Sequence, residues 1–294
     1  MAKTREIKKR IKAVANIKRI TRTMQMIATA KFSAAQQRSL AGKPYTEALF
    51  DLVAELASGA GDSLDHPLLK SQEKPGARTL TLVLTSDRGL CGPYNGSILR
   101  TSMAYFRADE AARSGVIEVV GKKGVGFYKF NKINVTTHHV QFGDKPQYDE
   151  VDRLAQSYID RFIAGEVGRV NVVYMRYISA GKQAPEVMQL LPFKTPARAS
   201  AAEGAAGVNA IYEFSPAGPE LLAVIVPAAI KATLFQAFKD AVVSEHVARM
   251  VAMKAATDNA GKMGKALTRT YNRARQAQIT TELTEIISGA AALE

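Results

Sequence analysis

The first thirty residues carry a narrow apolar stripe on a segment whose other positions are mostly basic. The stripe recurs at intervals of three and four residues, at Ile7, Ile11, Val14, Ile17, Ile20, Met24 and Ile27. This spacing places side chains along one line of an α-helix. The intervening residues include Lys8, Lys9, Arg10, Lys12, Lys18, Arg19 and Arg22. Because an all-basic outer face cannot be buried in a globule, the stripe predicts a second helix packed along a coiled-coil seam.

The N-terminal helix is expected to be interrupted once. Gly42 and Pro44 should bend or break it, since proline removes a helical hydrogen bond and clashes with the preceding turn. The apolar pattern resumes at Tyr45 and ends in the sequence SGAG at residues 58–61.

The C-terminal part of the chain has a second narrow stripe of small and apolar residues. Between residues 219 and 289 the only breakers are Pro227, Gly261 and Gly264. A helix of about seventy residues would be on the order of 100 Å long, which is too long for the interior of a small domain. We therefore expect the two terminal helices to pair as an antiparallel coiled coil, left-handed because the period is near 3.5 residues.

The middle of the chain changes to a β pattern. Runs rich in β-branched residues at 79–85, 116–120 and 169–177 alternate with helix-compatible segments near 98–113, 124–130 and 151–163. Such alternation predicts βαβ units on a mainly parallel sheet, a Rossmann-like α/β domain. The stretch 181–207, rich in Ala, Pro and Gly, is expected to be a loop or edge.

These patterns divide the chain into three parts. We predict an N-terminal coiled-coil helix at 1–58, a central α/β domain at 75–215, and a C-terminal coiled-coil helix at 216–290 that pairs with the first.

Composition limits the partners and the compartment. The chain has 40 Lys and Arg against 27 Asp and Glu, a formal charge of +13, which favours acidic partners such as nucleic acid, anionic lipid or an acidic protein. A single cysteine, Cys91, excludes an internal disulfide and suits a reducing compartment. The longest apolar run, 221–230, is about half a bilayer span and contains Pro227, so no transmembrane helix is expected. The apolar period begins at Ile7, which argues against a basic presequence.

Two glycine-containing segments could hold a ligand or could be plain turns. The sequence GKKGVG at 121–126 follows a strand and could present amides to a phosphate, but it matches neither common phosphate-binding motif, so a strand-to-helix turn is favoured. In SDRGLCG at 86–92, Cys91 could act as a nucleophile with Asp87 and a distant histidine. We favour a rigid contact loop with left-handed geometry at Gly89 and Gly92.

The histidines and the basic N-terminal helix can be explained without a metal or nucleic-acid ligand. His138 and His139 are adjacent on an apparent strand and point to opposite faces, so they cannot chelate one metal and are expected at the surface. His246 is expected to make a local hydrogen bond. The basic helix could contact nucleic-acid phosphates, but it has no aromatic platform before Phe32, and an acidic protein wall is the simpler partner.

Four segments together resemble the gamma-subunit family of F-type ATP synthases. They are ITRTMQMIA at 20–28 with Lys31, the loop SDRGLCG, the run SEHVARMVAMKAATDNA at 244–260, and YNRARQAQITTELTEIISGA at 271–290. The resemblance covers essentially the whole chain in order, and its last motif is highly specific. The chain departs from the family pattern at Pro93 and in the Ala-rich stretch 197–207.

The resemblance implies a rotor shaft rather than an enzyme. In that family the paired terminal helices stand inside the ring of alpha and beta subunits, and the α/β domain lies on the c-subunit ring beside the epsilon subunit. The resemblance implies no cofactor, no bound nucleotide, no nucleic acid, and membrane contact only through the c ring. It also implies a peripheral position on the cytoplasmic face of a bacterial inner membrane.

The resemblance carries over to individual residues. Contacts to the catalytic ring are implied for Met24, Arg88, Cys91, Arg249, Arg275, Gln276, Thr280 and Glu282. A weaker match implies contact with the c ring for Tyr212 and Glu213. Two other classes stay open at this point: a nucleotide-binding α/β enzyme, which would bind nucleotide tightly, and a nucleic-acid-binding coiled coil, whose affinity would fall steeply with salt.

Overall fold

The computed structural model describes residues 2–59, 66–70, 77–194 and 218–291. The chain divides into two compact units, residues 1–30 with 249–294 and residues 31–248. Both long helices contribute to both units: α1 spans Ala2–Gly59 and α6 spans Gly218–Ala291. The boundaries 1–58, 75–215 and 216–290 stay a prediction about domains, because the compact units cut across both helices.

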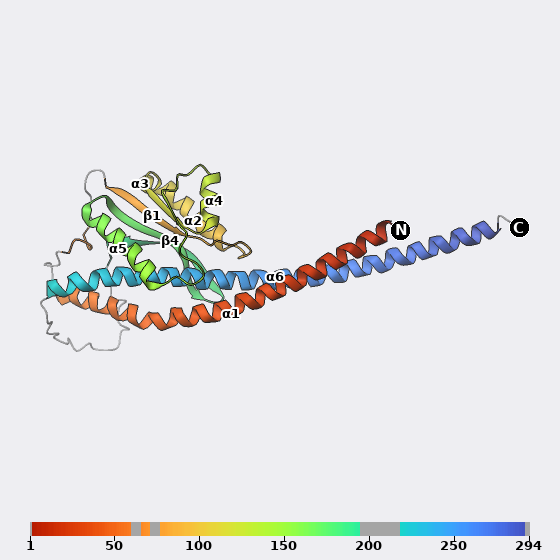
Figure 1. Ribbon diagram of the computed structural model, residues 1–294, viewed down its shortest axis with the longest axis horizontal. Coiled ribbons are helices and arrows are strands. Elements are labelled where there is room, and N and C mark those ends of the chain that lie inside the picture. The colour runs from red at the N-terminus through yellow and green to blue at the C-terminus, as the bar shows by residue number, and fades with distance from the viewer. Residues whose placement is uncertain (1, 60–65, 71–76, 195–217, 292–294) are drawn as a thin grey trace. The chain divides into compact units, whose positions relative to one another are not determined.

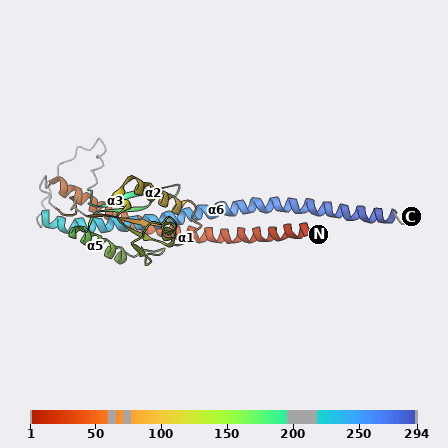
Figure 2. The same ribbon diagram turned by 90° about the horizontal axis from the view of Figure 1, so that it is seen from above.

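In the first unit, α1 and α6 lie side by side and run in opposite directions (Figures 1 and 2). The Thr257 hydroxyl donates to the Thr21 hydroxyl at 2.8 Å, and the Thr4 hydroxyl donates to the Gln278 side-chain oxygen at 3.2 Å. Residue numbers therefore rise along one helix as they fall along the other. The predicted antiparallel coiled coil is confirmed.

The seam of this unit follows a strict 3.5-residue period. Its buried and half-buried α1 positions include Thr4, Ile7, Ile11, Val14, Thr21, Gln25 and Ala28. The predicted stripe is wrong at Ile17, Ile20 and Ile27, which are 52%, 56% and 52% exposed, whereas Met24 is half-buried as predicted. These isoleucines follow shorter intervals and drift round the helix, whereas two supercoiled helices must meet every 3.5 residues.

Small residues keep the two axes close. On α6 the seam contains buried Met253, Thr257 and Ala260, followed by half-buried Gly261 and Gly264. Ile11, Val14 and Lys18 of α1 face these glycines across a groove of about 500 Å³. Large side chains on one helix thus meet small ones on the other.

The end of α6 continues past the start of α1 in both views (Figures 1 and 2). The apolar residues of this tip are exposed: Ile279 by 48%, Leu283 by 54%, Ile286 by 68% and Ile287 by 67%. No described segment of the chain covers them.

The second unit is built on a five-stranded sheet. Its strands are β1 (Arg78–Leu84), β2 (Val116–Val120), β3 (Thr137–His139), β4 (Val167–Ser179) and β5 (Lys182–Leu191). The strand order is β3-β2-β1-β4-β5, parallel throughout except for the antiparallel pair β4 and β5. The predicted mainly parallel α/β domain is confirmed.

Helices cover both faces of the sheet (Figure 1). One face packs against α2 (Tyr94–Ala108), the short α3 (Glu110–Arg113) and α4 (Lys122–Phe130), with Ile98, Phe106 and Tyr128 buried. The other packs against α5 (Tyr148–Ala164) and against the parts of α1 and α6 in this unit.

Of the two alternatives predicted for residues 181–207, the edge holds for residues 182–191, which form the edge strand β5. Pro185 is tolerated there because a missing N–H costs least at an edge. The predicted interruption at Gly42 and Pro44 is wrong, because helix α1 continues through Pro44. Buried Thr46, Leu49 and Val53 anchor the following turns, so tertiary packing outweighs the lost helical hydrogen bond.

One described helix is long and apolar enough to cross a membrane by length and composition alone. It covers Glu220–Ala291, and 44% of its most apolar stretch is buried inside the protein. Within the second unit its apolar residues Leu222, Val226, Ile230 and Leu234 are at most 4% exposed. They belong to the protein core, so their apolar character is explained by packing on the sheet side of the unit.

Gly264→Ala is expected to stabilise the coiled coil by about 0.5–1 kcal/mol, because alanine favours a helix interior more than glycine does. An added Cβ would lie 3.9 Å from Val14 Cγ1, an ordinary contact. Thermal unfolding followed by circular dichroism measures the change. Gly289→Ala is the control and should have little effect, because Gly289 lies in the exposed last turn of the same helix, and a helix end opens before the rest of the structure unfolds. A destabilised Gly264→Ala variant would contradict the expected contact, because it would mean that the seam has no room for a Cβ at this position.

Candidate functional site

The connection after β1 lies where a ligand would be sought in an open α/β sheet. The sheet order reverses at β1, with β2 on one side and β4 on the other. Ligands of such folds bind beyond the carboxyl ends of the strands at this switch point. Residues 85–92 occupy this position, which makes them the first candidate for a site.

The chain's own atoms fill the anion-binding position at the start of α4. The amide of Gly124 donates to Thr85 Oγ1 at 2.9 Å and that of Lys122 donates to Asp87 Oδ1 at 3.0 Å. The Lys123 amide donates to the Ser86 carbonyl at 3.1 Å. A phosphate would need these same amides. The structure therefore favours the strand-to-helix turn, made with Gly121 at φ 92°, over a phosphate cradle.

The loop at 86–92 is rigid because polar side chains brace it from within. Ser86 Oγ donates to the Arg88 carbonyl at 2.6 Å, and the Ser86 amide donates to Asn95 Oδ1 at 3.0 Å. Asn95 Nδ2 lies 3.2 Å from the sulfur of Cys91, which is 2% exposed. Within the described part of the chain, no hydrogen bond joins Cys91 to a histidine. The arrangement favours a contact loop over a cysteine nucleophile.

The tip of this loop presents an apolar side chain from a strained backbone. Leu90 has φ 63° and is 62% exposed. Gly92 also has a positive φ, as predicted, but Gly89 does not, so the expected left-handed residue at Gly89 is Leu90 instead. A leucine in this conformation is uncommon and costs energy, and such strain concentrates at functional surfaces.

Asp144 joins this loop to α1. The residue lies between β3 and α5, and its Oδ2 accepts a hydrogen bond from Lys31 Nζ and lies 3.6 Å from Arg88 Nη1. Burial alone would raise the pKa of Asp144, but the Lys31 hydrogen bond and the charges of Lys31, Arg88 and His246 outweigh it and lower that pKa. Asp144 is therefore held as a carboxylate between two cations.

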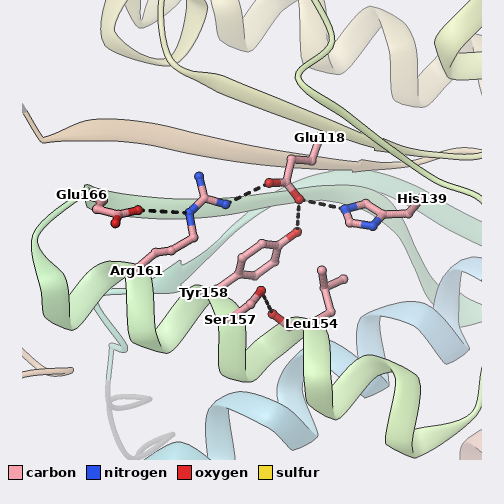
Figure 3. Close-up of polar contacts among 7 residues, drawn as sticks. All are labelled: Glu118, His139, Leu154, Ser157, Tyr158, Arg161 and Glu166. Carbon is pink, nitrogen blue, oxygen red and sulfur yellow. Dashed lines mark hydrogen bonds and ion pairs between the residues drawn. The ribbon is translucent and has the colours of Figure 1, made fainter.

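A second charged cluster lies inside the α/β domain, around Glu118 of β2 (Figure 3). Its side chain, 5% exposed, meets His139 Nε2 at 2.7 Å, the Tyr158 hydroxyl at 2.8 Å and Arg161 Nη1 at 3.0 Å. His139 comes from β3, whereas Tyr158 and Arg161 come from α5. The prediction that His139 is a surface residue is wrong, because the side chain is 11% exposed and engaged with Glu118.

The Glu118 cluster is structural in character. Burial would raise the pKa of Glu118, but hydrogen bonds from His139, Tyr158 and Arg161 outweigh it and lower that pKa. Burial also raises the pKa of Tyr158 well above its ordinary value, so this hydroxyl remains a donor. The carboxylate is saturated by its partners. In the described part of the chain, no group of three potential metal ligands is found either.

Comparison with known proteins decides between an enzyme, a nucleic-acid-binding protein and a subunit of a larger assembly. The sequence family described as ATP synthase matches residues 3–293. The ATP synthase gamma chain of Rhodopirellula baltica is 45% identical over 297 residues, all of both chains. This chain belongs to the ATP synthase gamma-chain family. The gamma chain of Desulfitobacterium hafniense is 38% identical, again over the full length of both.

Solved structures agree with the fold of this family. A chain of the Euglena gracilis mitochondrial ATP synthase, from the OSCP/F1/c-ring structure in rotational state 3, matches with a TM-score of 0.65 at 19% identity, covering 99% of this chain and 95% of that one. A rotor chain of the same enzyme in rotational state 1 matches with a TM-score of 0.60, covering 95% and 99%.

The structure places the predicted contact residues of this gamma chain in two groups. On the first unit, Met24 and Arg249 are half-buried, whereas four residues near the end of α6 are exposed: Arg275, Gln276, Thr280 and Glu282. Neighbouring turns connect some of them, since the Thr280 hydroxyl donates to the Gln276 carbonyl at 3.0 Å. Arg88 and Cys91 share the braced loop of the second unit. Tyr212 and Glu213 lie outside the described residues.

Sequence reasoning missed Glu118, Asn95 and Asp144. A signal for Glu118 was present, because a single carboxylate inside the apolar run VIEVV must be paired if that strand is buried. Asn95 and Asp144 lie in polar turns, where nothing in a single sequence separates them from solvated neighbours. Their partners are distant in sequence, and only the fold brings them together.

Glu118→Gln should lower the free energy of unfolding by about 2 kcal/mol, because Arg161 loses its nearest counter-charge and keeps the more distant Glu166 at 3.8 Å. The effect should depend on pH. Since folding lowers the pKa of Glu118, its contribution is present above the ordinary value of 4.5 and is lost as pH falls through the folded-state value. Urea unfolding at pH 7 and at pH 4 measures both.

Asp160→Asn on the outer face of α5 is the matched control. Among the described residues, Asp160 accepts a hydrogen bond from Gln156 one turn away, an exposed contact worth less than about 0.5 kcal/mol. Equal losses in the two variants, or a Glu118→Gln loss that does not shrink in acid, would contradict the role given to the cluster.

Proposed function

We propose that this gamma chain is the central rotor stalk subunit of an F-type ATP synthase. In this role it couples proton-driven rotation of the c ring to the conformational cycle of the catalytic alpha/beta ring. The observation that carries the proposal is the full-length family match, extending from residue 3 to 293 and including both terminal helices. The antiparallel helix pair and the α/β domain supply the parts that a stalk needs.

The helix pair can transmit a rotational state because it is asymmetric. Its two helices differ in length and in surface, so each orientation presents different groups to the surrounding subunits. A stalk can bias a partner's conformational equilibrium only through such differences in contact energy. A symmetric rod would favour no catalytic subunit over another.

The chain itself does no catalysis. Nucleotide chemistry belongs to the beta subunits, and the position where an α/β enzyme would bind phosphate is filled here by Thr85 and Asp87. The contribution of this subunit is mechanical, through surfaces that meet moving partners.

Two surfaces serve the catalytic ring. One is carried by the helix pair, with Met24, Arg249, Arg275, Gln276, Thr280 and Glu282. The other is the loop at 86–92, where the Arg88 side chain is 71% exposed and faces an acidic surface of a beta subunit. Cys91, being buried, acts on this contact from inside the loop. Tyr212 and Glu213 serve the c ring, and the α/β domain also meets the epsilon subunit.

The complex is attached to a membrane through the c ring. This gamma chain therefore lies peripherally on the cytoplasmic face of a bacterial inner membrane, with no lipid contact of its own. The net charge of +13 favours contact with acidic surfaces of its partner subunits.

Co-purification tests the proposal directly. An affinity tag on this chain, expressed in its native cells, should recover alpha, beta, epsilon and c subunits from detergent-solubilised membranes in fixed ratio. The recovered complex should pump protons when it hydrolyses ATP. Recovery of the chain alone, or with nucleic acid released by salt, would contradict the proposal.

Arg275→Ala should lower the rate of proton-driven ATP synthesis about tenfold in assembled complexes, because a hydrogen bond to a charged group contributes about 1.5–3 kcal/mol. Arg273→Ala is the control. Both arginines are exposed, and two positions along a helix turn the side chain by about 200° to the opposite face. ATP synthesis in membrane vesicles measures the difference, and equal rates in the two variants would remove Arg275 from the contact.

A further inference from the structure

Asp144 gathers two cations from segments that are far apart in sequence. Lys31 lies on α1 and Arg88 lies in the loop after β1, and both approach the same carboxylate oxygen, Oδ2. His246 of α6 is also near, because it is among the groups that lower the pKa of Asp144. One carboxylate thus connects the braced loop with both long helices inside the second unit.

The two ion pairs differ in tightness. Lys31 donates a direct hydrogen bond to Asp144, and their side chains are 40% and 36% exposed. Arg88 Nη1 stands 3.6 Å away and its side chain is 71% exposed. Asp144 therefore fixes Lys31 firmly and orients Arg88 loosely, which leaves most of the guanidinium open to another acid.

Without Asp144 the two cations would repel each other. Both lie within 4 Å of one oxygen atom, so their charges are close, and like charges at such separations disfavour the arrangement, although solvent reduces the effect. Arg88 would then swing toward solvent. The internal bracing by Ser86 and Asn95 would still hold the loop backbone, but no described contact would tie the Arg88 side chain to α1.

We propose that Asp144 is a positioning residue for the contact between Arg88 and the catalytic ring. The inference rests on the proposed function and adds a residue that none of its contact surfaces includes. Asp144 does not touch the partner; it biases the Arg88 guanidinium toward one orientation before this group meets an acidic group. Preorganisation of this kind reduces the ordering cost at the moment of contact.

The expected consequence concerns coupling more than assembly. An Arg88 side chain that is free to reorient can meet its partner with similar energy in more than one rotational position. The bias between catalytic subunits then shrinks, since bias requires different contact energies in different positions. ATP hydrolysis would continue while proton movement per ATP falls.

Asp144→Asn in the purified complex, reconstituted into lipid vesicles, tests this. Asparagine keeps the shape and removes the charge. We expect the ratio of protons pumped to ATP hydrolysed to fall at least twofold, with subunit composition unchanged. Asp144→Glu, which keeps the charge, should recover most of the ratio.

Asp152→Asn is the matched control. Asp152 of α5 pairs with Lys231 of α6 at 3.0 Å, and their side chains are 30% and 19% exposed. This variant loses an ion pair of similar burial in the same unit but touches neither Arg88 nor Lys31. Its pumping ratio should equal that of the unmodified complex.

The outcomes separate the two proposals. An unchanged ratio in Asp144→Asn, or an equal fall in Asp152→Asn, would overturn the positioning role. If Asp144→Asn fails to assemble, Asp144→Glu decides: full coupling supports the role of the charge, and a defect overturns it. If the unmodified complex neither assembles nor pumps, the stalk function itself is wrong.

Discussion

The pairing of α1 with α6 along a seam of small and polar residues is the constraint on which the structure depends. Thr21 meets Thr257 in the first unit, and Ser39 meets Asp240 at 3.5 Å in the second. Both contacts join side chains more than 200 residues apart. Since neither helix could bury its narrow stripe alone, each is stable only beside the other. The α/β domain is inserted between them and packs on the same helices.

The α/β domain contains a buried carboxylate whose hydrogen-bonding capacity is filled by donors from its own side chains. Glu118 is nearly inaccessible, yet three donors surround it, so its ionised form remains favourable. Asp240 is the contrasting case: burial raises its pKa, and the donors Gln236 and Ser39 only partly offset this. Asp144 differs from both, because its side chain is 36% exposed and is held by cations. The degree of burial thus separates carboxylates that stabilise the core from one that orients a surface.

The periodicity of the apolar residues made most of this fold predictable, and the predictions that were wrong have physical causes. Strands β1, β2 and β4 and both terminal helices follow from periodicity. The seam beyond Val14 does not, because packing selects Thr21 and Ala28 by position while apolarity singles out Ile17 and Ile20. Strand β5 was hidden by Pro185, which only an edge position tolerates. The Asp144 contacts join α1, the β1–α2 loop and the β3–α5 connection, and no local pattern encodes such a meeting.

The exposed isoleucines explain why the shaft is incomplete as an isolated chain. Ile17, Ile20 and Ile27 point away from the seam, and Ile279, Ile286 and Ile287 extend beyond it, all about half or more exposed. Apolar surface of this extent on a strongly basic chain indicates partners rather than solvent. Leu90 adds an apolar tip held in a strained backbone. Contacts with partner subunits explain these exposed side chains better than the packing of the chain on itself does.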